Sequence, residues 1–372
     1  MSQSTSSRRI GVGIVGASAQ RGWARVAHIP ALQMLEAFDI RGVSTTRMDS
    51  ARETAEALDI ELAFDNHQEL VERPEIDLVV VAVKVPDHRN IVHDALAAGK
   101  MVYCEWPLAR NLFEAQALAA FARDKKLKTV VGLQGRQHPP VRFLRDLVRQ
   151  GAIGRPLSTS IRAHPTEATW YGHFDPPFEF MAESANGATM LSIAVGHALE
   201  PLAQVLGEFE SLSAVVSNQR GEGIRLRDGS RMKNDTPDEI AAVGLLQNHI
   251  VASLHYSAGN ALGKAMSWEI QGTAGSLLVE SSMAGYIHMG DLSITLRRGL
   301  APPQQITVPP AYLAEYSRLG DPAAGVARLY SQLAADLRTG TSNVPDFETA
   351  LRRQRTLDAF STSFSTGVRE RF

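Results

Sequence analysis

The first ~135 residues alternate short apolar runs with amphipathic segments, and this alternation constrains the fold more than any other feature of the sequence. Its clearest member is Asp77–Val83 (DLVVVAV), a continuous apolar run typical of a parallel strand that is buried on both faces. Short loops separate the runs, which indicates a parallel sheet with helices on both sides. The expected strands are Ile10–Gly16, Asp39–Ser44, Asp77–Val83, Met101–Cys104 and Lys128–Leu133, and the expected helices are Val26–Phe38, Asp49–Leu58, His88–Ala98 and Leu112–Asp124.

The pattern changes after about Gln137, where strand-like runs follow one another with few helices between them. We therefore predict two domains: an α/β dinucleotide-binding Rossmann domain over residues 8–136, and an α+β domain over residues 137–372. The second domain is expected to hold a large, mostly antiparallel, open-faced sheet, with the C-terminal helices packing back toward the first domain. The expected strands are Ser158–Ala163, Ser211–Ser217, Ile240–Leu246, Ile250–Tyr256, Ser267–Gln271, Ser276–Val279 and Ser293–Leu296, and the expected helices are Pro139–Gln150, Ala188–Leu206, Ala323–Leu337 and Phe347–Phe360.

Composition excludes several classes of function. The 372 residues carry a formal net charge of −2, so the chain has no electrostatic signature for nucleic acid or an anionic membrane. The single cysteine, Cys104, excludes an intramolecular disulfide and any site built from several cysteines, and we expect it to be buried in a strand. No histidine, aspartate and glutamate spacing predicts a metal site. Without a long apolar segment or a secretion signal, we expect a cytoplasmic protein.

A glycine-rich turn follows the first expected strand. Gly11-x-Gly13-x-x-Gly16 lies inside that strand, so it does not form a phosphate loop, which must follow the strand and open the helix. The segment from Gly16 to Gly22 fits better, with Gly16 in the tight turn and Ser18 where a second glycine usually stands. We predict that it binds a dinucleotide; the alternative is a plain turn between a strand and a helix.

The end of the second expected strand bears on the choice of cofactor. NAD sites usually carry an acidic residue there, but this sequence reads Val43–Arg47 (VSTTR). The hydroxyls of Thr45 and Thr46, together with Arg47, could hold a 2′-phosphate, which favours NADP slightly over NAD. The alternative is that Arg47 is simply solvated.

With these segments in view, the chain resembles the Gfo/Idh/MocA oxidoreductases, the family of glucose-fructose oxidoreductase and inositol dehydrogenase. The resemblance rests on the glycine turn, Ala82–His88, Ala98–Lys100 leading to Glu105–Ala109 (EWPLA), and Gly272–Leu277 (GTAGSL). It implies a homodimer or homotetramer formed through the second-domain sheet. The glycine turn, the end of the second expected strand and this resemblance together give the predicted cofactor-binding residues: Gly16, Ser18, Arg21, Gly22, Trp23, Thr45, Thr46, Arg47, Val83, Val85, His88, Glu105, Trp106 and Gln134.

Within the family, the chain is most similar to the branch of the galactose-pathway repressor of yeasts. Members of that branch bind a dinucleotide but act as sensors, which leaves open whether this chain is an enzyme. The strings that carry this likeness are Arg21–Ala24, Glu105–Trp106, Leu133–Arg136, Trp170–Gly172, Val216–Asn218 and Thr236–Asp238.

The family's chemistry rests on a Glu-Lys-Pro motif and a downstream Asp-x-x-x-His. This sequence departs at two positions: Trp106 replaces the lysine, and Ile193 stands four residues before His197, where the aspartate would be. His197 remains, and Glu200 follows on the same helical face. The resemblance therefore favours His197 as general acid or base, a role that suits its near-neutral pKa, whereas residue pattern alone favours a hydrogen-bonded core histidine.

Two further residues could assist His197. The Tyr171 phenol could donate a hydrogen bond to a sugar oxygen, or it could be a packed aromatic side chain in a loop. Lys84 follows an expected strand at the sheet edge where ligands bind, although a solvated or phosphate-facing lysine is the more common arrangement.

Several residues are candidates for contact with the substrate. Trp106 could stack on a nicotinamide or sugar ring but cannot exchange a proton at neutral pH. Arg136 could bind a carboxylate with two parallel hydrogen bonds, or it could pair with a structural acid. The predicted substrate-binding residues are Trp106, Arg136, Trp170, Tyr171, His173 and His197.

The sequence thus supports three functions. The favoured one is an NAD(P)-dependent oxidoreductase that transfers a hydride to or from a sugar, a polyol or a related cyclic alcohol or ketone. The second is a dinucleotide-binding regulator that acts through a protein partner, because no DNA-binding module is present. The third is a lyase or epimerase with transient redox of the nicotinamide.

Overall fold

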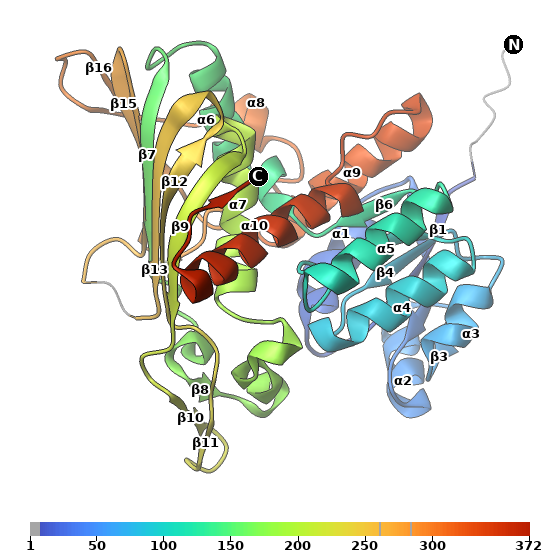
Figure 1. Cartoon of the computed structure of the whole chain (residues 1–372). Helices are drawn as coiled ribbons and strands as arrows, with labels where there is room; N and C mark the ends of the chain where they lie inside the picture. The colour runs from blue at the N-terminus through green and yellow to red at the C-terminus, as the bar shows by residue number, and fades with distance from the viewer. Residues whose placement is uncertain (1–7, 260–261, 283–284) are drawn as a thin grey trace, which may run out of the picture. The chain divides into compact units, whose positions relative to one another are not determined.

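A computed structural model describes residues 8–259, 262–282 and 285–372, and it divides the chain into two compact units (Figure 1). The first unit takes in the chain up to Leu108 together with Glu114–Gly132 and Tyr316–Thr349. The second unit consists of Ala109–Phe113, Leu133–Glu315 and Ala350–Phe372. Both units are therefore assembled from separate stretches of the chain.

The described residues of the first unit form a six-stranded sheet in the order β3-β2-β1-β4-β5-β6, and every neighbouring pair is parallel. This order reverses between β1 and β4, so it is a doubly wound Rossmann arrangement. The predicted fold class is confirmed for this unit. The strands are β1 (Ile10–Val15), β2 (Phe38–Ser44), β3 (Leu62–Phe64), β4 (Leu78–Val81), β5 (Met101–Cys104) and β6 (Thr129–Val131).

Helices cover both faces of this sheet. The segments η1 and α1 pack together with α9, while α4 and α5 cover the opposite face, in front of the strands in Figure 1. The helical elements are η1 (Ala24–His28), α1 (Ile29–Gln33), α2 (Met48–Leu58), α3 (His67–Glu72), α4 (Val85–Ala97), α5 (Leu112–Asp124) and α9 (Ala323–Thr339).

The core of the first unit includes a segment from far along the chain. Val326, Leu329, Tyr330 and Leu333 of α9 lie in the same buried cluster as Ile14 of β1. Each of these side chains is at most 1% exposed. The Rossmann core is therefore completed by residues more than 300 positions away from its first strand.

One predicted helix of this unit was too long. Val26–Phe38 was expected as a single helix, but α1 ends at Gln33 and Phe38 already pairs with Ile10 in the sheet. Residues 34–37 hold no glycine or proline to mark the stop, so strand pairing, which depends on tertiary structure, overrides the local helical preference.

The second unit is built on a nine-stranded sheet with the order β17-β16-β15-β14-β7-β13-β12-β9-β18 among its described residues. Only the β7–β13 pair is parallel within it, so the predicted mostly antiparallel sheet is confirmed. Along β13, buried and more exposed residues alternate, as in a sheet packed on one face. Helix α10 touches the sheet where the Ala214 amide donates to Ser363 Oγ.

The strands of this sheet are β7 (Pro156–Ala163), β9 (Phe209–Ser217), β12 (Glu239–Leu246), β13 (Ile250–Ser257), β14 (Met266–Gly272), β15 (Gly275–Ser281), β16 (Ser293–Arg298), β17 (Gln304–Ile306) and β18 (Glu370–Arg371). A smaller sheet contains β8 (His173–Phe174), β10 (Glu222–Arg225) and β11 (Arg231–Lys233). The helical elements are η2 (Gln134–Gln137), α6 (Pro139–Arg149), η3 (Ala168–Tyr171), η4 (Pro176–Ala182), η5 (Ser184–Asn186), η6 (Leu191–Val195), α7 (Gly196–Leu206), η7 (Gln247–His249), α8 (Pro310–Leu313) and α10 (Phe347–Thr366).

The helix predicted over Ala188–Leu206 starts later, as η6 running into α7. Thr189 and Ser192 explain the start, because each side-chain oxygen accepts a hydrogen bond from the other residue's backbone N–H, at 3.1 and 2.8 Å. The segment Ser184–Leu206 is long and apolar enough to cross a membrane by length and composition alone, although no such stretch was expected from the sequence. However, 78% of its most apolar stretch is buried within the protein, as in a core helix.

Candidate functional site

The turn after β1 lies where the strand order of the first unit reverses. Gly16 has a φ of +93°, and a Cβ atom there would lie 2.6 Å from the carbonyl oxygen of Ala82, just beyond β4. Only glycine tolerates both the conformation and the close approach. In doubly wound sheets, the crevice at the carboxyl ends of such strands is where nucleotides bind.

The loop that follows has two features suited to a dinucleotide. Gly22 also has a positive φ, +87°, and nothing described lies within 4 Å of a Cβ placed there, so the backbone remains approachable. The indole Nε1 of Trp23, at the N-cap of η1, is buried without a hydrogen-bond partner in the described part of the chain. Ser18 accepts a hydrogen bond from the Gln20 amide, and Arg21 is exposed. An orphaned donor beside an open loop fits a phosphate-bearing ligand.

The end of β5 is held in place by a chain of side chains. Glu105 Oε1 contacts His28 Nε2 at 2.9 Å, and His28 Nδ1 contacts the Tyr330 hydroxyl at 2.8 Å. The His28 side chain is fully buried, and Tyr330 comes from α9. Trp106 follows Glu105, is only 5% exposed and precedes Pro107 through a cis peptide bond. The orientation of Glu105 is therefore set by side chains from two distant helical segments.

His88 lies at the start of α4 and connects this loop to the end of β4. Its Nδ1 is 2.8 Å from the Pro107 carbonyl oxygen, and its Nε2 is 3.1 Å from the Val83 carbonyl oxygen. Burial lowers the pKa of His88, so the neutral ring donates one of these two bonds. The ring thus positions two backbone segments around the predicted cofactor site. Val85 is buried at the first position of α4, and Lys84 is exposed at its N-cap.

At the end of β2, the Thr45 hydroxyl already has hydrogen-bond partners within the protein. Its hydroxyl lies 2.8 Å from the Arg47 carbonyl oxygen and 2.7 Å from Ser50 Oγ, which fixes the turn into α2. Thr46 and Arg47 are exposed. Of the predicted group for a 2′-phosphate, Thr46 and Arg47 remain accessible, while Thr45 shapes the turn that presents them.

In the second unit, His197 lies in the first turn of α7 and packs against a second histidine. The rings of His197 and His288 are stacked, with centroids 3.9 Å apart. Neither Nδ1 has a hydrogen-bond partner among the described residues. Burial lowers the pKa of His197 to about 3, and burial with the neighbouring His197 and His138 lowers the pKa of His288 well below its usual value. Both rings are therefore neutral at physiological pH.

The low pKa of His197 predicts acid sensitivity. The unfolded chain, with a histidine pKa of 6.5, binds more protons than the folded chain between pH 6.5 and about 3, so stability falls as the pH falls. We expect the burial of the neutral His197 ring alone to lower the free energy of unfolding by about 2 kcal/mol when the pH falls from about 7.5 to about 5. Urea titrations at both pH values should show this loss reduced in His197→Gln and unchanged in His249→Gln, whose side chain is 87% exposed. An undiminished loss in His197→Gln would contradict the burial of a neutral ring.

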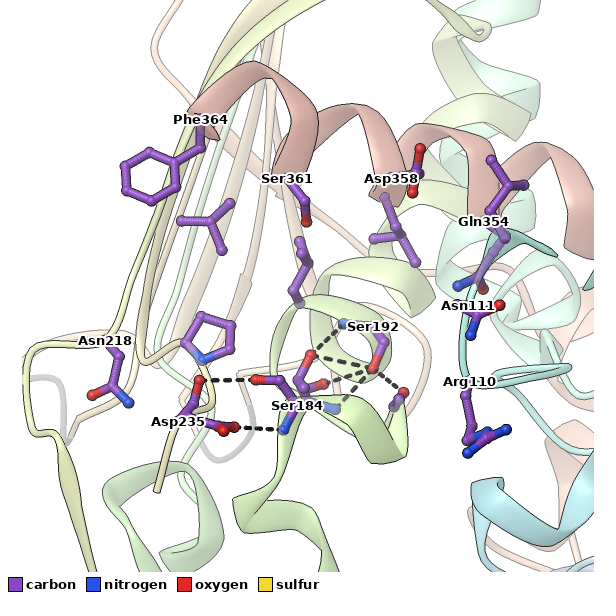
Figure 2. Close-up of a pocket in the computed structure, with 17 residues that line it drawn as sticks. Arg110, Asn111, Ser184, Ser192, Asn218, Asp235, Gln354, Asp358, Ser361 and Phe364 are labelled. Carbon is purple, nitrogen blue, oxygen red and sulfur yellow. Dashed lines mark hydrogen bonds between the residues drawn. The ribbon is translucent and has the colours of Figure 1, made fainter. Parts of the chain in front are cut away.

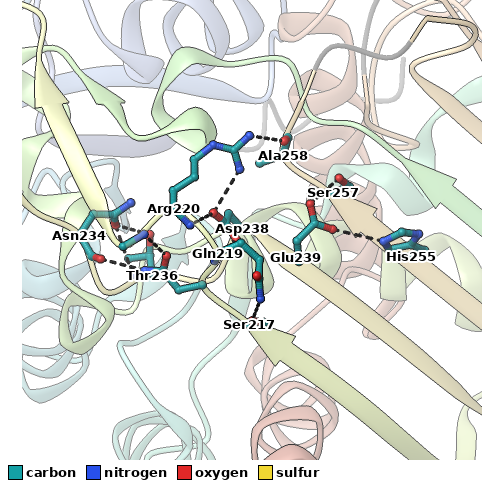
Figure 3. Close-up of polar contacts among 12 residues, drawn as sticks. Ser217, Gln219, Arg220, Asn234, Thr236, Asp238, Glu239, His255, Ser257 and Ala258 are labelled. Atoms are coloured by element: carbon teal, nitrogen blue, oxygen red, sulfur yellow. Dashed lines mark hydrogen bonds and ion pairs between the residues drawn. The ribbon is translucent and has the colours of Figure 1, made fainter.

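Tyr171 lies beside Arg220. Figure 3 shows how Asp238 and Ala258 anchor the Arg220 side chain. The Arg220 guanidinium lies 6.0 Å from the Tyr171 ring centre, and it also bonds Asp238 at 3.1 Å and the Ala258 carbonyl oxygen at 3.0 Å. Partial burial and the Glu167 carboxylate raise the pKa of Tyr171, so the phenol stays protonated at neutral pH. It can donate a hydrogen bond but does not act as a base.

The neighbouring predicted residues are placed differently. The Trp170 indole N–H already donates to Glu167 Oε2 at 2.8 Å and to the Tyr286 hydroxyl at 2.9 Å. His173 lies half-buried in β8, two residues from Tyr171. Gln134 is buried in η2, and its Oε1 has no hydrogen-bond partner among the described residues. Gln134 therefore keeps an acceptor for a ligand, whereas the N–H of Trp170 is used within the unit.

Arg136 pairs with a structural acid, one of its two predicted alternatives. Its Nε lies 2.7 Å from Glu200 Oε1, while Arg353 Nε lies 3.0 Å from Glu200 Oε2. Arg353 also bonds Glu208, so four charges form one network. Burial raises the pKa of Glu200, but the two arginines outweigh it and hold that pKa below its usual value. Glu200 is fully buried and ionised.

Sequence reasoning identified residues in each unit but missed their partners. His28, His288 and Arg353 were not predicted as site residues, although each contacts one that was singled out. No local signal marks them, because their partners are distant in sequence. In the described ranges, no group of three or more His, Cys, Asp or Glu is placed to hold a metal ion.

Comparisons with known proteins agree with this architecture. Residues 10–133 match the model of an oxidoreductase family with an NAD-binding Rossmann fold, and residues 139–281 match that of the Gal80p C-terminal domain. "Dehydrogenase aclE" of Aspergillus oryzae is 33% identical over 286 residues, which cover 74% of this chain and 77% of the relative. The galactose/lactose metabolism regulatory protein GAL80 of Saccharomyces cerevisiae is 26% identical, covering 91% of this chain and 84% of the relative.

A solved structure extends the likeness of fold to the whole chain. Levoglucosan dehydrogenase in complex with NADH and L-sorbose superposes with a TM-score of 0.82 at 22% identity. The match covers 98% of each chain. The relatives therefore include both dehydrogenases and a regulatory protein.

Proposed function

Because this chain belongs to the Gfo/Idh/MocA family of oxidoreductases, we propose that it is an NAD(P)-dependent dehydrogenase or reductase acting on a sugar, a polyol or a related cyclic alcohol or ketone. The observation that carries this proposal is the close approach of Gly16 to Ala82 at the point where the strand order reverses. The names of two relatives, dehydrogenase aclE and levoglucosan dehydrogenase, support the reaction type.

In this proposal, the first unit holds the dinucleotide through the Gly16–Trp23 loop and the residues that follow β2 and β5. NAD(P), when bound, exchanges a hydride with the substrate carbon. Trp106, with its buried aromatic ring, provides an apolar surface for a flat ring. Glu105, fixed by His28, provides an acceptor for hydroxyl groups.

The second unit supplies the proton chemistry. Oxidation of an alcohol removes a hydride from carbon and a proton from oxygen, and the neutral His197 ring is in the form that can accept that proton. A pKa of about 3 also makes it a weak base, so protonating it at pH 7 costs about 5 kcal/mol. The proton must therefore pass on to solvent, while Tyr171 or Lys84 assists by donating a hydrogen bond to the substrate oxygen.

A redox assay tests the proposal. The purified protein receives NAD or NADP with a panel of sugars, polyols and sugar acids, and the absorbance of the reduced nicotinamide is followed. We expect turnover with at least one cyclic alcohol, its loss in His197→Ala, and unchanged dinucleotide affinity in that variant. His249→Ala is the matched control, because its side chain is exposed. Full turnover in His197→Ala would refute the role of His197.

A regulatory function is the second candidate, and one observation favours it. Trp106 occupies the position of the family's lysine and cannot exchange a proton at neutral pH. The match of residues 139–281 to the Gal80p C-terminal domain points the same way. Tight dinucleotide binding, measured by fluorescence, without turnover on the whole panel would favour this function over the dehydrogenase.

Cofactor preference follows from the end of β2. Arg47 is exposed there with no acidic residue in the VSTTR segment, so we propose a preference for NADP over NAD. Arg47→Asp should weaken NADP binding by about 10- to 100-fold relative to NAD, because a carboxylate would repel the 2′-phosphate. Fluorescence titrations with both cofactors measure this ratio without any substrate. Arg52→Asp, on the exposed side of α2, should leave it unchanged; an unaltered ratio in Arg47→Asp would exclude the phosphate contact.

A further inference from the structure

The second unit contains a cavity of about 470 Å³ that none of the predicted site residues lines (Figure 2). Its walls come from α10, from the segment around η5 and η6, from the end of β9 with the loop before β12, and from Arg110–Leu112. All of these segments belong to one unit. The volume lies within the range of pockets for small organic ligands.

The lining combines hydrogen-bonding groups with an apolar surface. Leu191, Val216, Leu357 and the ring of Phe364 provide the apolar part. The polar groups are amides, carboxylates and hydroxyls that come from separate segments and lie around the cavity in Figure 2. They include Asn111, Asn218, Asp235, Gln354, Asp358 and Ser361, and Ser184, Thr189 and Ser192 add three further hydroxyls.

Gln354 is the strongest indication of a ligand. The residue is only 6% exposed, and its Oε1 has no hydrogen-bond partner in the described parts of the chain. Figure 2 shows its amide reaching from α10 toward the cavity. A buried acceptor left unpaired destabilises the protein. A ligand in the cavity that donates a hydrogen bond to this oxygen would remove that cost.

The charges narrow the class of ligand. Arg110 is the only cationic residue among the described lining residues. The carboxylates are Asp358 and Asp235, of which Asp235 is paired with Lys233 at 3.4 Å. An anion would gain one cation, Arg110, but would face the Asp358 carboxylate. Hydroxyl groups, in contrast, both donate and accept, and so they match carboxylates and amides together. The apolar surface suits the C–H faces of a ring.

We propose that this cavity binds a neutral, polyhydroxylated molecule of about the size of a monosaccharide. The proposed dehydrogenase residues His197, Tyr171 and Lys84 do not line this cavity.

Calorimetric titration of the full-length protein without cofactor tests the proposal. The probes are D-glucose, D-galactose and sorbitol, with glucuronate as the anionic comparison, each up to about 50 mM. We expect saturable binding of at least one neutral probe, and binding of glucuronate at least about tenfold weaker. If no neutral probe binds, or if glucuronate binds better, the proposal is wrong.

Two variants assign the binding to this cavity. Ser361→Trp places a large side chain into it from an exposed position and should weaken binding at least about tenfold, whereas Ser365→Trp, one turn further along α10, should bind as the wild type does. Gln354→Leu should also weaken binding about tenfold, by removing the unpaired acceptor. Unchanged binding in Ser361→Trp would overturn the proposal. Dinucleotide affinity and any turnover should persist in Ser361→Trp, so failure of this site is distinguishable from failure of the dehydrogenase.

Discussion

Replacing Glu200 with alanine is expected to lower the free energy of unfolding by about 3–5 kcal/mol. The carboxylate is fully buried and receives hydrogen bonds from both Arg136 and Arg353, whose side chains are 15% and 3% exposed. Without Glu200, two guanidinium groups face the same emptied space in the core. Arg353 keeps its partner Glu208, but both cations lose the buried carboxylate between them. The cost comes from this loss of charge pairing and much less from the lost volume.

Urea unfolding of the variant and the wild type at neutral pH measures this effect. Glu222→Ala is the matched control, because Glu222 pairs with Arg231 on the surface, where the two side chains are 60% and 80% exposed. That change should cost at most about 1 kcal/mol. Equal losses in the two variants would mean that the Glu200 network contributes no more than a surface pair.

Replacing Gly16 with alanine is expected to abolish measurable dinucleotide binding. The new Cβ would meet the Ala82 carbonyl oxygen at 2.6 Å, and a φ of +93° is strained for any L-residue with a side chain. The backbone must move to relieve both, and the movement displaces the turn that leads to the phosphate-facing loop. We expect affinity to fall at least about 100-fold, the scale of a misplaced binding loop.

Fluorescence titration with NAD and NADP measures the loss. Gly99→Ala is the control, because Gly99 also has a positive φ, +75°, but a Cβ there meets nothing within 4 Å among the described residues. It should lower stability slightly and leave affinity unchanged. If both variants bind normally, the turn at Gly16 does not shape the cofactor site.

Much of the regular structure was predictable from the sequence, because apolar periodicity reports burial directly. Met101–Cys104 and Leu112–Asp124 were predicted with the bounds that the structure gives to β5 and α5. The elements that were missed in the first unit are short: β3 has three residues and α3 has six. Periodicity cannot be read over such lengths, and their positions depend on pairing with β2 and on packing against α4.

The predicted site shows a similar limit. Gly16 could be found because a turn after a first strand has a local signature. His28 could not, since its partners Glu105 and Tyr330 lie 77 and 302 residues away in the chain. For Arg136, the sequence could not decide between binding a carboxylate ligand and pairing with a structural acid, because only the fold brings Glu200 next to it. Local patterns locate a loop, but long-range contacts decide what each side chain does.

The position of α9 has a consequence for how this protein is made. Tyr330 and Leu333 belong to the same buried cluster as β1, so the ribosome must synthesise more than 330 residues before the first unit can close its core. Until then, the nascent Rossmann segment exposes the apolar side chains that α9 will cover. The second unit is almost entirely translated within that interval. The part of the protein that is made first is therefore among the last to become stable.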